Sequence, residues 1–205
     1  MPEFPQCRRT SWAEVDGWAD RIAAQIRERG HVPDALVGLT RGGWVPARLL
    51  ADRLGIKRMI SLRLQHWGVT ATPSGKAELT EGLSAPVTGL KILVVDDITD
   101  TGESLELATQ HVTQSGAKRV ESATCLHIAH SKFAPTYFAE EIPRDRWVWV
   151  VFPWNYWEDL TTLAGRASEV NSELSSIART LEERCGLSIP IEDLQRLAQR
   201  RPEAA

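Results

Sequence analysis

The stretch that decides the fold runs Ile92-Leu-Val-Val-Asp-Asp-Ile-Thr-Asp-Thr-Gly-Glu-Ser104. It begins with a continuous apolar run, which is typical of a strand in a parallel sheet covered on both faces. The run ends in two carboxylates, Asp96 and Asp97, and a loop rich in Thr, Gly and Ser then leads into a helical pattern. Ligands of open α/β sheets bind beyond the carboxyl ends of the strands. The stretch therefore predicts a strand, a ligand-binding loop and a helix.

The residue types in this loop suit a sugar phosphate. A helix N-terminus offers free N–H groups and positive potential, so a phosphate monoester can bind there. Amides and hydroxyls for this purpose come from five consecutive residues, Asp100, Thr101, Gly102, Glu103 and Ser104. The carboxylates of Asp96 and Asp97 would repel a phosphate, but they suit a vicinal diol or a metal-bound sugar. Together these groups predict a ribose 5-phosphate site. The alternative is a strand-end Asp pair before an ordinary capped helix, because Asp and Thr are common in such turns.

A second strand–turn–helix pattern lies upstream, over residues 35–54. Between its apolar strand and its helix stands the turn Thr40-Arg41-Gly42-Gly43. Two glycines let the backbone approach a polyanion closely, and Arg41 brings positive charge. Thr40, Arg41 and Gly42 are therefore candidates for binding a pyrophosphate group. A plain turn with an exposed arginine is the alternative interpretation.

The rest of the chain alternates between strand and helix patterns as far as residue 152. Helices are predicted at residues 12–29 and 101–115, and strands at residues 58–64, 119–128 and 147–152. This alternation predicts βαβ units, and hence an α/β fold with a twisted parallel sheet flanked by helices. Residues 65–89 are too long for a simple connection, which favours a mobile functional loop or a partly formed hairpin. Beyond Gly165, Val170, Leu174, Ile177 and Leu181 mark one helix, and Ile191, Leu194 and Leu197 mark another.

Composition excludes several classes of protein. The 24 basic and 27 acidic residues give a net charge of −3, so no strong basic field attracts nucleic acid or an anionic membrane. The three cysteines lie far apart without a CxxC pair, which argues against a disulfide framework or a Cys-rich zinc site and indicates a reducing, cytoplasmic setting. The longest apolar run has about five residues, far short of the roughly 20 that span a bilayer. His66, His111, His127 and His130 show no metal-ligand spacing, which favours exposed or core roles.

Two of these segments resemble a known family. Residues 94–104 resemble the phosphoribosyl-pyrophosphate (PRPP) signature of type I phosphoribosyltransferases, which has an apolar strand, two acids, two variable residues, then Asp, Ala or Thr before Thr-Gly. Residues 38–50 resemble the family's pyrophosphate loop, especially that of xanthine-guanine enzymes. The resemblance covers about residues 11–159 and implies the type I fold, Mg²⁺ as cofactor, and a homodimer or homotetramer. It also implies a cis peptide bond between Thr40 and Arg41.

The resemblance carries over to the purine site residue by residue. Members specific for 6-oxopurines carry Asp before Thr-Gly, which implies that Asp100 accepts the N7 proton as the glycosidic bond forms at N9. Lys132 resembles the family lysine that donates to the exocyclic O6. Counting back from Pro153 and Trp154 places the aromatic that stacks on the purine at Trp149, and the Val150 carbonyl then faces the base edge. Asn155 stands where the family often has a carboxylate for the 2-substituent.

The resemblance implies transfer of a 5-phosphoribosyl group from PRPP to N9 of guanine, xanthine or hypoxanthine. In this scheme Asp96 and Asp97 bind the ribose hydroxyls and, mainly through PRPP, the Mg²⁺ ion. The expected organisation is a phosphoribosyltransferase domain over residues 1–165 and a helical extension over residues 166–205. The domain includes a small hood, the segment in which an aromatic side chain stacks on the purine. The alternative is a PRPP-sensing regulator that binds without turnover, for which the C-terminal helices are the only candidate appendage. The sequence does not rank the three 6-oxopurines.

Overall fold

The computed structural model describes residues 4–66 and 77–199. The contacts within the chain divide it into two units. The larger is Trp12–Trp147, and the smaller combines Met1–Ser11 with Val148–Ala205.

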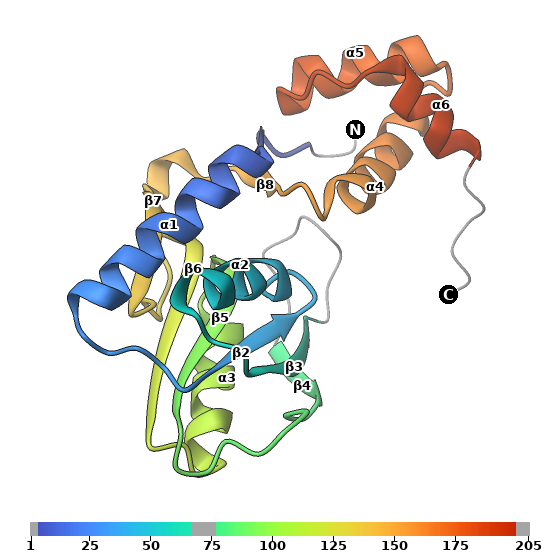
Figure 1. Ribbon diagram of the computed structural model, residues 1–205. Coiled ribbons are helices and arrows are strands. Elements are labelled where there is room, and N and C mark those ends of the chain that lie inside the picture. The colour runs from blue at the N-terminus through green and yellow to red at the C-terminus, as the bar shows by residue number, and fades with distance from the viewer. Residues whose placement is uncertain (1–3, 67–76, 200–205) are drawn as a thin grey trace. The chain divides into compact units, whose positions relative to one another are not determined.

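The larger unit is built on one mostly parallel sheet, drawn in Figure 1. Its strand order is β4-β3-β2-β5-β6-β7, and every neighbouring pair is parallel except β3 with β4. The strands are β2 (Ala35–Thr40), β3 (Met59–His66), β4 (Ala77–Glu81), β5 (Lys91–Thr99), β6 (Arg119–Ile128) and β7 (Tyr137–Ile142). The α/β class and the parallel sheet predicted from the sequence are therefore confirmed.

Both faces of this sheet are covered by helices (Figure 1). Successive side chains of a strand point to opposite faces, so a strand covered on both faces is apolar throughout. In β5, Leu93 and Val95 pack with α1 (Trp12–Glu28) and α2 (Trp44–Leu54). Ile92 and Val94 pack with the buried side chains of α3 (Glu103–Gln114) on the other face.

The sheet changes winding direction between β2 and β5. Strand β2 continues through α2 to β3 on one side, whereas β5 continues through α3 to β6 on the other. Gly38 of β2 lies beside Val95 of β5 in the parallel register. The loops that leave the carboxyl ends of these two strands therefore diverge, and such a switch point is where open α/β sheets bind ligands.

The smaller unit joins both ends of the described chain. Strand β1 (Cys7–Arg9) pairs in parallel with β8 (Trp149–Val151). Three helices follow β8, namely α4 (Tyr156–Ser168), α5 (Leu174–Cys185) and α6 (Ile191–Gln199). Their apolar side chains share one core that includes Leu160, Leu181 and Leu194. The Tyr156 hydroxyl donates to Asp193 Oδ2 at 2.6 Å, and burial together with this bond raises the pKa of Tyr156 to about 12.

Several elements differ from the sequence-based expectation. Residues 147–152 contribute a strand, but it belongs to the separate β1–β8 pair and not to the main sheet. The sixth strand of the main sheet is instead β7, which carries two glutamates and has no strict alternation. Helix α4 is not predicted by the sequence, and it runs across the expected domain boundary at residue 165. That boundary stays a prediction. Val170, expected in a helix, is exposed and precedes α5.

The segment at residues 65–89 is partly a hairpin. Strand β4 pairs with β3 in antiparallel register, with Leu64 opposite Leu79, which is the arrangement that the hairpin interpretation expects. Residues 67–76, where a mobile loop is the other expectation, lie outside the described residues.

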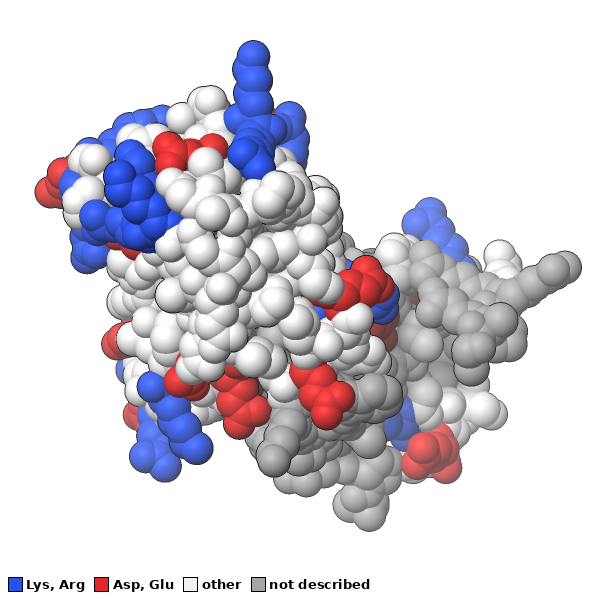
Figure 2. Space-filling model, turned by 90° about the horizontal axis from the view of Figure 1, so that it is seen from below, with Lys and Arg blue, Asp and Glu red and all other residues white. Residues whose placement is uncertain are grey.

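The outer surface carries charges of both signs. On the face in Figure 2, basic and acidic side chains both surround an area without charged residues. None of the helices in residues 4–66 and 77–199 is long and apolar enough to cross a membrane.

Candidate active site

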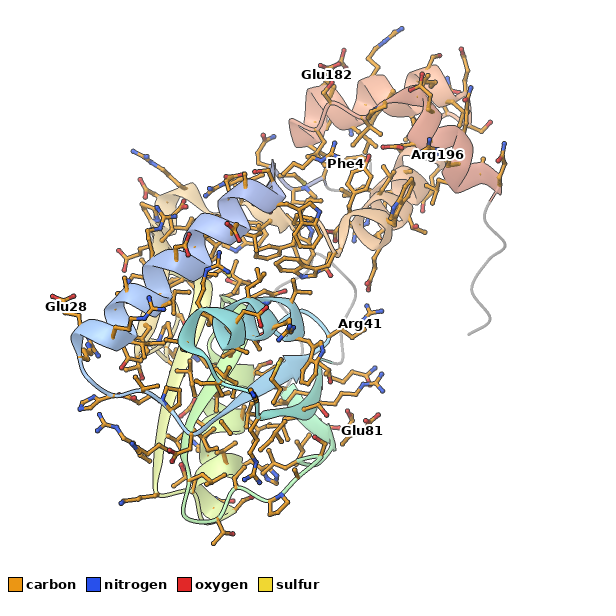
Figure 3. The ribbon with its side chains drawn as sticks, in the orientation of Figure 1. Phe4, Glu28, Arg41, Glu81, Glu182 and Arg196 are labelled. Carbon is orange, nitrogen blue, oxygen red and sulfur yellow. The ribbon has the colours of Figure 1, made fainter. Side chains whose placement is uncertain are left out.

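The turn after β2 lies directly on the end of β5. Its Thr40–Arg41 peptide bond is cis, as the family resemblance implies. A Cβ atom at Gly42 would collide with the Asp97 carboxylate, and one at Gly43 would collide with the Val95 carbonyl oxygen and lie 2.7 Å from Asp96 Cα. Figure 3 shows the Arg41 side chain extending away from the strands. The predicted pyrophosphate turn and the acid pair are thus one contiguous structure.

We expect Gly43→Ala to destabilise the protein, because the atoms it meets are backbone atoms of the central strand. Overpacking of this kind costs about 1–3 kcal/mol. In a chain of this size that lowers Tm by roughly 2–4 °C per kcal/mol. Thermal unfolding measures the effect. Gly17→Ala is the matched control, because a Cβ on that glycine of α1 meets nothing within 4 Å. An unchanged Tm in the Gly43 variant would contradict the close packing of this turn.

The two acids lie in the C-terminal half of β5 and are held by the local backbone. The strand continues past them to Thr99, whereas the sequence predicts that it ends at this pair. Asp96 Oδ1 accepts the Asp97 amide at 3.0 Å, and Asp97 Oδ1 accepts the Ile98 amide at 2.9 Å. Burial, and then the neighbouring Asp97 charge, raise the pKa of Asp96 well above its usual value. Burial and the charges of the same two acids also raise the pKa of Cys125 on β6. Asp96 is therefore costly to ionise beside Asp97, and a cation or a hydroxyl ligand would offset that cost.

Asp96→Asn should stabilise the protein when PRPP is absent. The pKa of Asp96 is raised in the folded state above the unfolded value of about 3.9, so the folded state holds its proton more tightly. The stability contributed by this group is fully present below the unfolded pKa and is lost as pH rises through the folded pKa. We expect the Tm of the Asn variant to be a few degrees higher at neutral pH. In a chain of this size, about 1 kcal/mol in the free energy of unfolding shifts Tm by about 2–4 °C. The difference should disappear near pH 4.

The measurement is thermal unfolding without ligand across the pH range, with EDTA present. Asp52→Asn is the control, because that carboxylate is exposed and paired with Arg48 on the surface of α2. A variant that is less stable than wild type at alkaline pH would contradict the raised pKa.

The predicted phosphate loop leads into α3 as expected, although the helix begins at Glu103 and not at Thr101. Gly102 adopts a left-handed conformation with φ of 90°, where glycine is favoured. A Cβ there would also lie 2.6 Å from Ser131 Oγ. The Lys132 amide donates to the Thr101 carbonyl at 3.2 Å. The segment after β6 therefore packs against the phosphate loop, and Ser104 lies in the first turn of α3.

Asp100 has two neighbours that sequence reasoning missed. His130 Nε2 lies 3.0 Å from Asp100 Oδ1, and Trp147 Nε1 donates to the same oxygen at 3.3 Å. No spacing rule connects these three positions, because each follows a different strand. His127 differs from His130, since it is buried with its ring 5.1 Å from the Phe138 ring, and burial lowers its pKa.

The residues predicted to bind the purine fall in both units. Lys132 is an exposed residue of the larger unit. Trp149 belongs to the smaller unit, where it packs against the helical core and its indole N–H donates to Asp159 Oδ1 at 3.0 Å. Val150 is buried beside Arg8 of β1, and Asn155 stands at the N-terminus of α4. Their common role in purine binding stays a prediction.

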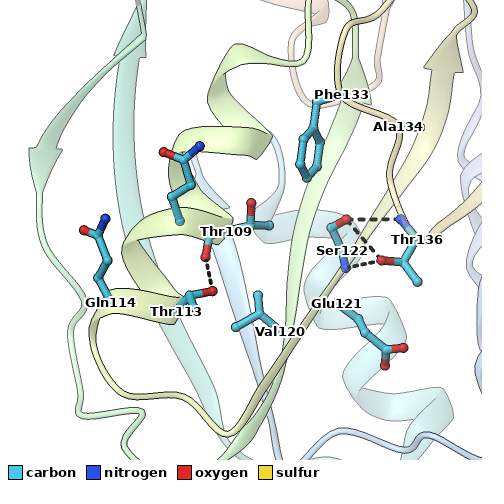
Figure 4. Close-up of a pocket in the computed structure, with 10 residues that line it drawn as sticks. Thr109, Thr113, Gln114, Val120, Glu121, Ser122, Phe133, Ala134 and Thr136 are labelled. Carbon is cyan, nitrogen blue, oxygen red and sulfur yellow. Dashed lines mark hydrogen bonds between the residues drawn. The ribbon is translucent and has the colours of Figure 1, made fainter.

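A pocket of about 370 Å³ lies elsewhere on the larger unit, between α3, β6 and residues 133–136 (Figure 4). Its lining is rich in threonine and glutamine and includes Ser122, whose backbone amide donates to Thr136 Oγ1 at 3.1 Å. None of the predicted site residues lines this pocket, and its lining contains no basic side chain. It is therefore poorly suited to a polyphosphate.

The described residues offer a magnesium ion only part of its ligands. Within residues 4–66 and 77–199 no three His, Cys, Asp or Glu side chains are grouped so as to hold a metal. The Asp96 and Asp97 carboxylates nevertheless fit Mg²⁺, which is usually bound through one or two carboxylates together with water and substrate phosphates.

Comparison with known proteins agrees with this arrangement of loops. Residues 11–163 match the family described as the phosphoribosyl transferase domain. The chain belongs to this family. A xanthine-guanine phosphoribosyltransferase of Cereibacter sphaeroides is 31% identical to this chain over 163 residues. The match covers 71% of this chain and 84% of the relative.

Solved structures place the fold in the same family. A purine phosphoribosyltransferase from Pyrococcus horikoshii Ot3 is 26% identical with a TM-score of 0.62, covering 73% of this chain and 94% of that one. The xanthine-guanine-hypoxanthine phosphoribosyltransferase of Helicobacter pylori is 22% identical with a TM-score of 0.59. That match covers 82% of this chain and 99% of the Helicobacter pylori chain. The protein thus has the type I phosphoribosyltransferase fold.

Proposed function

We propose that the protein transfers the 5-phosphoribosyl group of PRPP to N9 of a 6-oxopurine and releases pyrophosphate. The observation that carries this proposal is the packing of the Thr40–Gly43 turn on the acid pair at the switch point between β2 and β5. A turn with an arginine and two glycines, two carboxylates and a helix N-terminus lie along adjacent strand ends, in the order that the parts of PRPP require. The family match, and the purine-specific names of its relatives, support the same reaction.

Each part of the site has one task in this proposal. The Asp96 and Asp97 carboxylates accept hydrogen bonds from the ribose hydroxyls. The amides and hydroxyls of residues 100–104 bind the 5′-phosphate at the start of α3. Thr40, Arg41 and Gly42 bind the pyrophosphate, where negative charge grows as the bond to C1′ breaks. Mg²⁺, carried mainly by PRPP and reached by the acid pair, would neutralise part of that charge.

Asp100 is the proposed proton acceptor. As purine N9 attacks C1′, N7 loses its proton, and a carboxylate beside N7 can take it. A carboxylate is a weak base at neutral pH, so its position matters more than its basicity. On the base itself we assign Lys132 to O6, Trp149 to the ring face and the Val150 carbonyl to the base edge.

The direct test incubates the protein with Mg²⁺-PRPP and guanine, xanthine, hypoxanthine or adenine, and follows nucleoside monophosphate and pyrophosphate together. We expect equal amounts of both products with at least one 6-oxopurine and little with adenine. Calorimetric titration with PRPP, alone and with guanine, accompanies the assay. PRPP binding without consumption would instead favour the regulatory alternative. Size-exclusion chromatography of the same sample tests the expected homodimer or homotetramer.

Lys132→Ala and Trp149→Ala should have different effects on base selection. A charged hydrogen bond contributes about 1.5–3 kcal/mol, and stacking on a base contributes about 1–3 kcal/mol. Each variant should therefore raise the purine KM about tenfold to a hundredfold while the KM for PRPP stays within a few-fold. Lys132→Ala should also weaken discrimination against adenine, since adenine has no acceptor at its 6-position. Trp149→Ala should weaken all purines alike, because stacking does not distinguish base edges.

Values of KM for guanine, hypoxanthine and adenine in both variants test this assignment. Lys118→Ala is a suitable control, because this exposed lysine precedes β6 at the opposite end of the strand. Equal losses toward PRPP and purine would contradict the assignment.

A further inference from the structure

We infer that His130 is a positioning residue for Asp100, holding one carboxylate oxygen so that the other faces the purine N7 proton. This inference rests on the proposed function, in which Asp100 is the proton acceptor. It assigns a task to a histidine for which the sequence pattern indicates only an exposed or core role.

The contacts of Asp100 are the starting observation. Two nitrogen atoms converge on Oδ1: His130 Nε2 makes an ion-pair contact at 3.0 Å, and the Trp147 indole N–H donates a hydrogen bond at 3.3 Å. Both the His130 and the Asp100 side chains are about one-third exposed, so the contact lies at an open site and not in the core. With Oδ1 contacted by both side chains, Oδ2 is the oxygen that serves the substrate.

Backbone hydrogen bonds hold the residues on both sides of His130, so the position of His130 is well defined. The preceding amide, of Ala129, donates to the Ile142 carbonyl of β7 at 3.0 Å, and the following amide, of Ser131, donates to the Ile128 carbonyl at 2.9 Å. Ser131 Oγ also donates to the Phe133 carbonyl at 2.9 Å. The loop therefore presents the imidazole toward Asp100 from the end of β6, on a turn tied to both neighbouring strands.

Such a contact has a physical consequence for proton transfer. The last torsion of an aspartate is broad, so an unrestrained carboxylate samples many orientations. A hydrogen bond from a histidine N–H to a carboxylate is charge-assisted and directional, and it narrows that range. Misplacing a reacting group by about 1 Å can cost a hundredfold in rate. Loss of the His130 contact should thus lower kcat and leave substrate affinity almost unchanged.

Lys132, two residues further along, has a different environment. Its backbone amide donates to the Thr101 carbonyl at 3.2 Å, while its side chain is exposed. The side chain of this loop that is in contact with the proposed proton acceptor is therefore that of His130. Its effect on kcat should be separable from the effect of Lys132 on the purine KM.

The test compares His130→Gln with His130→Asn. The glutamine amide nitrogen can occupy the position of Nε2 and donate to Asp100, whereas the asparagine amide is one bond too short. We expect kcat to fall about tenfold to a hundredfold in the Asn variant, and to stay within about threefold of wild type in the Gln variant. The KM values for PRPP and purine should change less than about threefold in both. His111→Asn, on α3, is the matched control and should retain wild-type kcat.

Three outcomes would overturn the inference. These are equal kcat losses in the Gln and Asn variants, unchanged kcat in both, and a raised purine KM with kcat preserved, which would make His130 a base-binding residue. Melting temperatures of both variants exclude unfolding as the cause of a lost kcat. A wild-type protein that makes no nucleotide would overturn the proposed function itself, and would be evident before any variant is compared.

Discussion

Asp100→Asn should lower kcat by about 10²–10⁴-fold, which is the range expected when a positioned general base is lost. The substitution keeps the size and shape of the side chain and removes its ability to accept a proton. PRPP affinity should hardly change, because the ribose and the pyrophosphate are assigned to other residues, and residues 100–104 bind the 5′-phosphate through amides and hydroxyls that this substitution leaves in place. Single-turnover measurements of nucleotide formation, together with calorimetric PRPP binding, separate the two effects.

The contacts of Asp100 strengthen this expectation. His130 and Trp147 both approach Oδ1 with nitrogen atoms, and the Trp147 indole nitrogen can only donate. In the Asn variant the amide oxygen should therefore turn toward these donors, and the NH₂ group should face the substrate. An NH₂ group opposite N7–H repels it and accepts nothing, so the defect should appear in the chemical step.

The control for this experiment is Asp145→Asn, which removes an exposed carboxylate between β7 and β8. Normal turnover by the Asp100 variant, accompanied by lost PRPP binding, would mean that Asp100 shapes the phosphate loop and takes no part in proton transfer.

The double variant Asp96→Asn, Asp97→Asn should lose PRPP affinity by about tenfold to a hundredfold. Each hydrogen bond from a ribose hydroxyl to a charged acceptor is worth about 1.5–3 kcal/mol, and asparagine leaves a neutral acceptor worth about 1 kcal/mol at both positions. Binding of a purine alone should change little. The effect on stability has the opposite sign, since the acid pair repels itself when no ligand is bound. A protein that melts higher and binds PRPP more weakly is therefore the expected combination.

Calorimetric titration with Mg²⁺-PRPP measures the affinity. Glu182→Gln with Glu183→Gln is the matched control, because it removes two adjacent, exposed carboxylates on α5. Undiminished PRPP affinity in the Asp96 and Asp97 variant would show that the ribose hydroxyls bind elsewhere.

The sequence was informative where one short segment encodes both a strand and the loop that follows it. Residues 92–104 and 35–54 each contain an apolar strand, a polar turn and a helix, so local pattern is sufficient to predict them. The cis bond at Thr40–Arg41 followed from the family resemblance and is confirmed. Local pattern does not state how closely the two segments pack, and the contact of Gly42 with Asp97 emerges only from the folded sheet.

The features that the sequence did not predict depend on partners far along the chain. Strand β1 has three residues, two of them arginines, and it exists because β8 lies beside it. The His130–Asp100 contact likewise requires that β5 and β6 be neighbours. Strand β7 is the last strand of the sheet among the described residues, and such an edge position tolerates its glutamates.

The pairing of β1 with β8 has a consequence for biosynthesis. Cys7 leaves the ribosome roughly 140 residues before its partner Trp149, a delay on the order of ten seconds at ordinary elongation rates. During that time the whole of the larger unit is synthesised, whereas β1 has no β8 to pair with. The nascent chain should therefore complete its central sheet first and close the smaller unit last.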